Sequence, residues 1–174
     1  SRDDRFTIDY SAVHIRESCI RSLRRLKRDT IDFYQLHTAR MEHLLDGQCI
    51  AAMQQLQQEG KVRWIGCSST LPHITTYIEW GLFDVYQIPY SALERAHENA
   101  CSQAAISGAG VINRGGVARG EPGVGLGNTD RWKSFEAANL DELREEGESR
   151  TAFLLRFLLS HPHISTTIVG TLIP

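Results

Sequence analysis

The strongest constraint on the fold is a repeated alternation of two hydrophobic patterns along the 174 residues. Short runs rich in β-branched and aromatic residues, such as residues 31–37 and 62–67, alternate with longer segments whose apolar residues recur every three or four positions. This alternation predicts an α/β fold with parallel strands, right-handed crossovers and helices covering the sheet. A doubly wound sheet and a (β/α) barrel both satisfy the pattern.

The patterns predict five strands and the helices that connect them. Ser11 is expected to cap the first helix, whose buried stripe is Ile15, Cys19, Leu23 and Leu26. The other predicted helices are residues 49–58, 73–80, 93–107 and 151–161, and the other strands are residues 85–88, 111–112 and 166–169. Residues 115–130 contain six glycines and Pro122, which predicts a mobile surface loop within a long irregular stretch.

Composition indicates an ordinary globular protein, which we expect to form a single domain over residues 1–174. Nineteen basic side chains face 21 acidic ones, so the formal charge of -2 gives no global reason to bind nucleic acid or an anionic membrane. A chain of this length buries roughly 70% of its unfolded surface, so it needs no disulfide or structural metal. The apolar stretch 152–159 is interrupted by Arg156 and is too short to span a membrane.

The four cysteines favour a reducing compartment. Cys19, Cys49, Cys67 and Cys101 are far apart and form no C-x-x-C pair, so they are expected to be buried free thiols. An even number of cysteines would also allow a secreted protein with two disulfide bridges. Because no signal peptide supports an oxidising compartment, we expect a cytoplasmic location.

Six segments of the chain resemble successive segments of the aldo-keto reductases. In the family's order they are SLRRL at 22–26, IDFYQLH at 31–37, EGKVRWIGCSS at 59–69, FDVYQIPY at 83–90, GVINRGGVARG at 110–120 and IVGT at 168–171. One such segment would be weak evidence, but six in the correct order cover almost the whole chain. The resemblance implies a (β/α)8 TIM barrel, which needs about 250 residues. The five strands here resemble the family's fourth to eighth strands.

The resemblance implies an oxidoreductase that reduces a small-molecule carbonyl substrate with a nicotinamide cofactor. Of the family's catalytic Asp, Tyr, Lys and His, only the histidine has a match, His37 at the end of a strand. The other three are expected upstream of Ser1, so we expect this portion alone to be a poor catalyst. Tyr34 and Tyr90 are expected to pack in the core rather than to replace the missing acid.

The nicotinamide carboxamide has one carbonyl acceptor and one amide donor, which suits hydroxyl and side-chain amide partners. Ser68, Ser69 and Gln87 match the family's carboxamide-binding positions. Ser69 stands where asparagine is common in relatives, so its reach is shorter.

The remaining cofactor positions follow the fourth and fifth predicted strands. Arg114 occupies the place of an aromatic residue that stacks on the nicotinamide ring, and a planar guanidinium also covers a π-face. Gly115, Gly116, Val117 and Arg119 match the loop that wraps the pyrophosphate, where glycine admits close approach of backbone N–H groups.

The expected end of the cofactor site lies at the C-terminal side of the chain. Gly170, Thr171 and Leu172 resemble the start of the segment that approaches the adenosine ribose and its 2′-phosphate. The family usually uses NADPH, so NADP is the expected cofactor. NAD stays open because the basic residue expected beyond this segment would lie past Pro174.

Two other function classes compete with the reductase. One is a barrel-derived binding or assembly module that self-associates through an open strand edge, whose N–H and C=O groups lack partners. The other is a metal hydrolase, prompted by seven histidines. Their spacing places no metal-ligand set on one helix face, so no metal site is expected.

Overall fold

The structure is a computed structural model that describes residues 9–170 of the chain. It divides into two compact units, the first ending at Cys67 and the second beginning at Ser68. The expectation of one domain over the whole chain stays a prediction.

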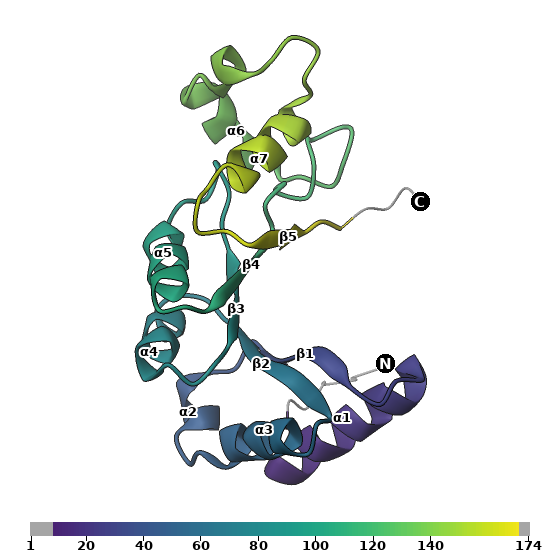
Figure 1. Cartoon of the computed structure of the whole chain (residues 1–174). Coiled ribbons are helices and arrows are strands. Elements are labelled where there is room, and N and C mark those ends of the chain that lie inside the picture. Colours follow the sequence, from purple (N-terminus) through teal and green to yellow (C-terminus); the bar gives the residue numbers. More distant parts are fainter. Residues whose placement is uncertain (1–8, 171–174) are drawn as a thin grey trace, which may run out of the picture. The chain divides into compact units, whose positions relative to one another are not determined.

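Unit 1 contains two strands and three helices. They are α1 (Ala12–Leu26), β1 (Ile31–His37), α2 (Met41–Leu44), α3 (Gln48–Gln58) and β2 (Val62–Ser68), whose last residue belongs to the second unit. The strands β1 and β2 are neighbours in the sheet, and α1 packs beside α3 (Figure 1). The short helix α2 was not expected from the sequence.

Helix α1 forms largely as its sequence predicts. The Ser11 hydroxyl accepts a hydrogen bond from the N–H of His14 at 3.2 Å and so caps the first turn. Ile15, Cys19 and Leu23 are buried, whereas Leu26 is 61% exposed. The stripe ends before Leu26 because the next residue adopts a left-handed conformation, with φ 53°, that terminates the helix.

Unit 2 contains three strands and the helices around them. They are α4 (His73–Trp80), β3 (Val85–Pro89), α5 (Glu98–Ile106), β4 (Gly110–Arg114), α6 (Thr129–Ala137), the 3-10 helix η1 (Leu140–Leu143), α7 (Arg150–Leu159) and β5 (Thr166–Ile168). The strands pair in parallel in the order β3-β4-β5. Helix α5 contacts both β3 and β4 and lies beside α4 (Figure 1). The parallel pairing and the strand-helix alternation agree with the expected α/β class.

The predicted start of the helix over residues 93–107 is wrong. Helix α5 begins at Glu98, because Ser91 and Glu94 exchange two backbone hydrogen bonds of 3.1 Å that hold the preceding segment in a tight turn. Leu93 is an apolar residue of that turn and packs against a hydrophobic cluster instead of joining the helix. The apolar spacing continues through this turn, so the sequence alone predicted a helix start that is five residues too early.

The stretch expected to be irregular contains α6 and η1. The Asn128 side chain accepts the N–H of Arg131 at 3.1 Å and caps α6, which buries Trp132 and Phe135 against α7 residues Phe153 and Leu154. Trp132 and Phe135 are the only large apolar residues of this helix, so its periodicity was too sparse to recognise.

Arg150 holds this part of unit 2 together. Its guanidinium forms ion pairs with Asp141 of η1, Glu136 of α6 and Glu121, and it lies 5.1 Å from the centroid of the Phe135 ring. A guanidinium that pairs with several carboxylates and stacks on a ring loses more than one contact when it is replaced. One residue at the start of α7 thus fixes the elements that precede it.

The prediction of buried free thiols is confirmed for all four cysteines. Burial raises the pKa of Cys67 and of Cys101 to about 12, so these thiols stay protonated and unreactive. Among the helices of residues 9–170, none combines the length and the apolar character that a membrane crossing requires.

Candidate functional site

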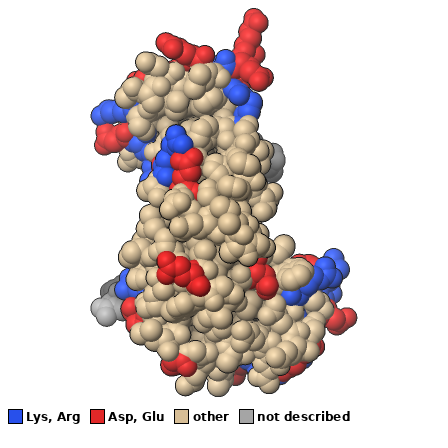
Figure 2. All heavy atoms as spheres, turned by 60° about the vertical axis from the view of Figure 1, so that its left-hand side comes forward, with Lys and Arg blue, Asp and Glu red and all other residues tan. Residues whose placement is uncertain are grey.

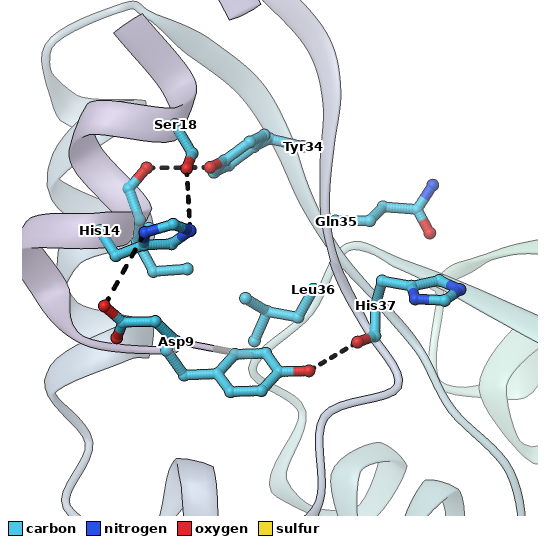
Figure 3. Close-up of a pocket in the computed structure, with 9 residues that line it drawn as sticks. Asp9, His14, Ser18, Tyr34, Gln35, Leu36 and His37 are labelled. Carbon is cyan, nitrogen blue, oxygen red and sulfur yellow. Dashed lines mark hydrogen bonds and ion pairs between the residues drawn. The ribbon is translucent and has the colours of Figure 1, made fainter. Parts of the chain in front are cut away.

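His37 ends strand β1 in unit 1 and has an exposed side chain. The hydroxyl of Tyr10 donates to its backbone carbonyl at 2.6 Å, and its ring Nδ1 lies 3.2 Å from the Thr38 hydroxyl. Figure 3 shows that the ring of His37 and the side-chain amide of Gln35 project from the same face of β1, away from α1. His37 is therefore held at its backbone, while its ring faces outward from the packed layer.

The opposite face of β1 borders a hollow of about 260 Å³ between α1 and this strand. In it Ser18 Oγ lies 3.1 Å from Nε2 of His14, whose Nδ1 is 3.8 Å from a carboxylate oxygen of Asp9 (Figure 3). The hydroxyl of Tyr34 donates to the backbone carbonyl of Ile15 at 2.9 Å. Polar groups of α1 and β1 therefore border this hollow. The ring of His37 projects away from it (Figure 3).

The two tyrosines expected to pack do so. Burial raises the pKa of Tyr34 and of Tyr90 to about 12, which keeps both phenols protonated at neutral pH. Tyr90 is fully buried, with its ring centroid 6.0 Å from that of Phe157 and 5.3 Å from that of His161.

Ser68 and Ser69 begin unit 2 and are buried, with exposed fractions of 2% and 4%. Within the described residues, the Ser68 hydroxyl has no hydrogen-bond partner. Gln87 lies in the middle of β3, half-buried between two buried neighbours, and pairs with Ile112 of β4. A buried hydroxyl without a partner is rare in a folded protein and marks a place where a ligand can supply one.

Arg114 is the last residue of β4. Its Nε atom is buried and has no hydrogen-bond partner among residues 9–170. The sheet register places it opposite Pro89 at the end of β3 and Ile168 at the end of β5. Arg114 therefore lies at the edge where these three parallel strands end, which is where α/β folds bind ligands.

His97 is a polar residue of this region that the sequence did not single out. It is 7% exposed and directly precedes α5. Its Nε2 accepts the backbone N–H of Leu71 at 3.1 Å, while its Nδ1 has no partner in the described part of the chain. Burial lowers the pKa of His97, and the nearby Arg114 lowers it further, whereas Glu94 raises it. No spacing rule distinguishes this histidine from an ordinary polar loop residue.

The loop after β4 folds as a series of turns. Gly115 has a φ of +73° with open space beside it, and Ala118, Arg119 and Gly120 follow with φ values of 48°, 66° and 82°. Val117 and Ala118 are buried, and Arg119 is exposed. Three consecutive residues in the left-handed region are unusual, and such strain persists only where surrounding packing enforces it.

Internal packing also favours glycine at position 116. A Cβ atom there would lie 2.7 Å from Cδ2 of Leu158 and 2.8 Å from Oδ1 of Asn113. A side chain at Gly116 would therefore force these neighbours to shift, whether or not a phosphate approaches. Gly170, in contrast, has nothing within 4 Å of a Cβ position.

The expected site residues are distributed over both units. Unit 2 holds Ser68, Ser69, Gln87, Arg114, the loop residues and Gly170, whereas His37 lies in unit 1. Thr171 and Leu172 lie outside the described residues. We predict that His37 and the unit 2 residues meet at one rim, because the resemblance implies a barrel whose parallel strands all end at the same face. No group of three metal-ligating side chains occurs among the described residues.

Comparisons with known proteins agree with the resemblance. The profile of the aldo/keto reductase family matches residues 3–172. An uncharacterised oxidoreductase of Bacillus subtilis is 29% identical over 176 residues, covering 93% of this chain and 57% of the relative. The L-galactose dehydrogenase of Arabidopsis thaliana is 28% identical over 175 residues, covering 93% and 55%. The NADH-specific methylglyoxal reductase of Escherichia coli is 38% identical over 92 residues, covering 51% and 28%.

A solved structure extends the match to three dimensions. The holo form of an aldo-keto reductase from Bacillus halodurans is 30% identical, with a TM-score of 0.79 over 98% of this chain and 58% of that one. The chain thus spans little more than half the length of the first relatives it matches. This similarity confirms the expected partial (β/α)8 barrel fold. With its match over residues 3–172, the chain belongs to the aldo/keto reductase family.

Proposed function

We propose that this chain is the cofactor-binding portion of an oxidoreductase that reduces a small carbonyl compound with NADPH or NADH. One observation carries the proposal: the Ser68 hydroxyl and the Arg114 Nε are both buried within unit 2 and lack protein hydrogen-bond partners. Because burying an unsatisfied polar group is unfavourable, a ligand with hydrogen-bonding groups at this edge of the sheet would be stabilised there. The carboxamide of a nicotinamide would pair with the Ser68 hydroxyl, and the Arg114 guanidinium would cover the π-face of the ring while its in-plane Nε–H stays available to a polar group of the cofactor or substrate.

Residues at different strands of unit 2 are proposed to contact different parts of the nicotinamide. Ser68, Ser69 and Gln87 would hold the carboxamide, and the Arg114 guanidinium would cover the ring. A bound nicotinamide cofactor supplies the hydride for carbonyl reduction.

The loop after β4 is proposed to hold the pyrophosphate. Gly115, Val117 and Arg119 would contribute, because Gly115 has open space beside it and Arg119 is an exposed cation. Gly116 is proposed to belong to the same site, and its close packing against Leu158 and Asn113 also favours glycine there. Gly170, Thr171 and Leu172 would approach the adenosine ribose.

His37 is the proposed donor to the substrate oxygen, which gains negative charge during reduction. Its Nδ1 is already beside the Thr38 hydroxyl, so Nε2 is the nitrogen that would face the oxygen. The other three tetrad positions of the family have no match in the 174 residues. We therefore propose that the 174-residue polypeptide binds the cofactor and turns over poorly, and robust carbonyl-dependent oxidation of NADPH by it would overturn this claim.

The nucleotide preference is proposed to be NADP, with NAD as the alternative. The family resemblance favours NADP, whereas the relative in Escherichia coli is by its name NADH-specific. Parallel titrations with both nucleotides distinguish the two.

The face of unit 2 that carries α4 and α5 is proposed to serve a small ligand rather than a nucleic acid or a membrane. Figure 2 shows few charged side chains over α4 and α5, and mixed signs over the part of unit 2 that holds α6 and α7. A polyanion partner would instead require a continuous basic face.

Calorimetric titration of the chain with NADH and NADPH tests the proposal. We expect saturable binding that weakens roughly tenfold in Gln87→Leu, because the carboxamide loses a paired amide. Gln54→Leu, an exposed glutamine on α3, is the matched control and should bind as the wild type does. Equal affinity of Gln87→Leu and the control, or the absence of binding, would refute the assignment.

The edge of β5 favours a second role, self-association. In unit 2 this strand pairs with β4, and its neighbourhood exposes Ile168 and Val169 by 53% and 47%. Exposed strand edges with apolar side chains pair readily with other chains. Sedimentation that gives a monomer at all concentrations would exclude this role.

A further inference from the structure

We propose that His97 is a positioning residue that holds residues 68–71 in the conformation that binds the cofactor. This inference rests on the proposed function of Ser68 and Ser69. It assigns a role to a histidine that lies outside the set of residues matched to the family.

The first support is a hydrogen bond between distant segments. The N–H of Leu71, two residues after Ser69, donates to Nε2 of His97 at 3.1 Å across 26 residues of sequence. On its other side, Thr70 offers its carbonyl to the N–H of Ile74 in the first turn of α4. The segment that carries the two serines is therefore held by α4 at its C-terminal end and by His97 through Leu71.

The second support is the protonation state that this bond requires. Because Nε2 accepts a hydrogen bond, the neutral ring carries its proton on Nδ1. That Nδ1 is buried and has no partner within residues 9–170, although His97 is only 7% exposed. An apolar side chain would fill this space without burying an unpaired donor. The acceptor at Nε2 is thus the feature that explains a histidine here.

The charges around His97 favour the neutral ring. Arg114 of β4 lowers the pKa of His97, as does burial, whereas Glu94 raises it. Glu94 is itself paired with Arg131 of α6 at 3.1 Å, which reduces its pull on the imidazole. Protonation would place a cation near Arg114 and would replace the acceptor for Leu71 with an N–H group.

Two substitutions separate the acceptor from the histidine ring. His97→Gln places an amide oxygen near the position of Nε2 and does not titrate, so it should preserve the bond to Leu71. His97→Leu fills a similar volume and provides no acceptor. His14→Gln, a histidine of α1 in unit 1, is the control for histidine replacement.

The first measurement is amide hydrogen exchange of Leu71 in the ligand-free chain at pH 7.5. We expect protection in the wild type, His97→Gln and His14→Gln, and roughly tenfold faster exchange in His97→Leu. The exchange of the amides of β4, which lies outside the segment 68–71, should stay unchanged, which shows that the variant is folded. Unchanged exchange of Leu71 in a folded His97→Leu would overturn the proposal, and so would loss of protection in His97→Gln.

The second measurement is the pH dependence of NADH affinity between pH 7.5 and 5.0. The wild type should lose roughly tenfold in affinity as pH falls below the ordinary histidine pKa of 6.5, whereas His97→Gln should show a flat profile. His97→Leu should bind weakly at every pH. A pH profile shared by the wild type and His97→Gln would contradict the role of His97. Failure of the wild type to bind NADH, with Leu71 exchange as expected, would refute the proposed function and leave the anchoring role supported.

Discussion

The side-chain amide of Asn113 donates to the backbone carbonyl of Tyr90 at 2.7 Å and joins the end of β4 to the chain that leaves β3. The same nitrogen lies 3.4 Å from the carbonyl of Ile88, and the amide oxygen accepts the Thr167 hydroxyl of β5 at 3.1 Å. Asn113 is fully buried. One side chain thus bridges all three strands of unit 2, directly before Arg114.

We predict that Asn113→Leu destabilises the protein by about 2–3 kcal/mol, because buried carbonyl and hydroxyl groups lose their partner. Thr167→Val removes only one of these bonds and should cost about 1 kcal/mol. Urea unfolding of the three proteins measures both values. Equal midpoints for Asn113→Leu and the wild type would show that the bridge contributes nothing.

Gly116 and Gly170 should respond differently to the same added methyl group. Gly116→Ala would place Cβ against Leu158 and Asn113, so we expect a loss of about 1–3 kcal/mol from overpacking. Gly170→Ala meets open space at an ordinary φ and should be neutral. Thermal denaturation distinguishes the two variants. An unchanged melting temperature for Gly116→Ala would show that Leu158 and Asn113 do not pack tightly against position 116.

Replacing Arg119 should raise the stability of the protein and lower its affinity for the cofactor. Its φ of 66° is in the left-handed region, where asparagine is tolerated better than arginine. Arg119→Asn is expected to gain up to about 1 kcal/mol of stability and to weaken cofactor binding severalfold through loss of the cation. Unfolding and calorimetry on the same preparation test this, and unchanged affinity would remove Arg119 from the pyrophosphate site.

Glu59 supplies a pH prediction for unit 1. Hydrogen bonds from Arg16 and Lys61, at 2.7 and 2.8 Å, lower the pKa of Glu59 to about 2. The pKa of Glu59 is lower in the folded protein than in the unfolded chain. The ion pairs of Glu59 with Arg16 and Lys61 therefore stabilise the fold above about pH 4.5, and this contribution is lost as the pH falls toward 2.

Carbon-detected NMR titration of the Glu59 carboxyl checks this value. Arg16→Gln should raise the pKa toward the ordinary 4.5, whereas Arg40→Gln, at an exposed pair with Glu42, should leave it unchanged. A titration of Glu59 near pH 4.5 in the wild type would show that these ion pairs do not persist in solution.

The sequence predicted the elements whose periodicity is dense. Residues 31–37 and 73–80 have the expected bounds, because the first is a short run rich in β-branched and aromatic residues and the second has helix-like apolar spacing. The α6 helix was missed because its packing depends on Trp132 and Phe135 meeting Phe153 of a distant helix. Such a tertiary contact leaves no local signal.

The candidate site was predictable only where a residue matches the family. Gln87 and Arg114 were identified in this way. His97 was not, because its role depends on an N–H group 26 residues away that only the folded chain brings near. The reason for Gly116 was also invisible, since Leu158 and Asn113 come from different elements.

Titration of the ¹⁵N-labelled chain with NADH and NADPH, followed by amide chemical shifts, tests whether unit 2 binds the nicotinamide cofactor. We expect saturable shifts that centre on Ser68, Gln87 and Arg114 in unit 2, with Arg24 and Arg25 of the exposed α1 surface unaffected. The absence of saturable shifts, or shifts confined to α1, would contradict cofactor binding by unit 2.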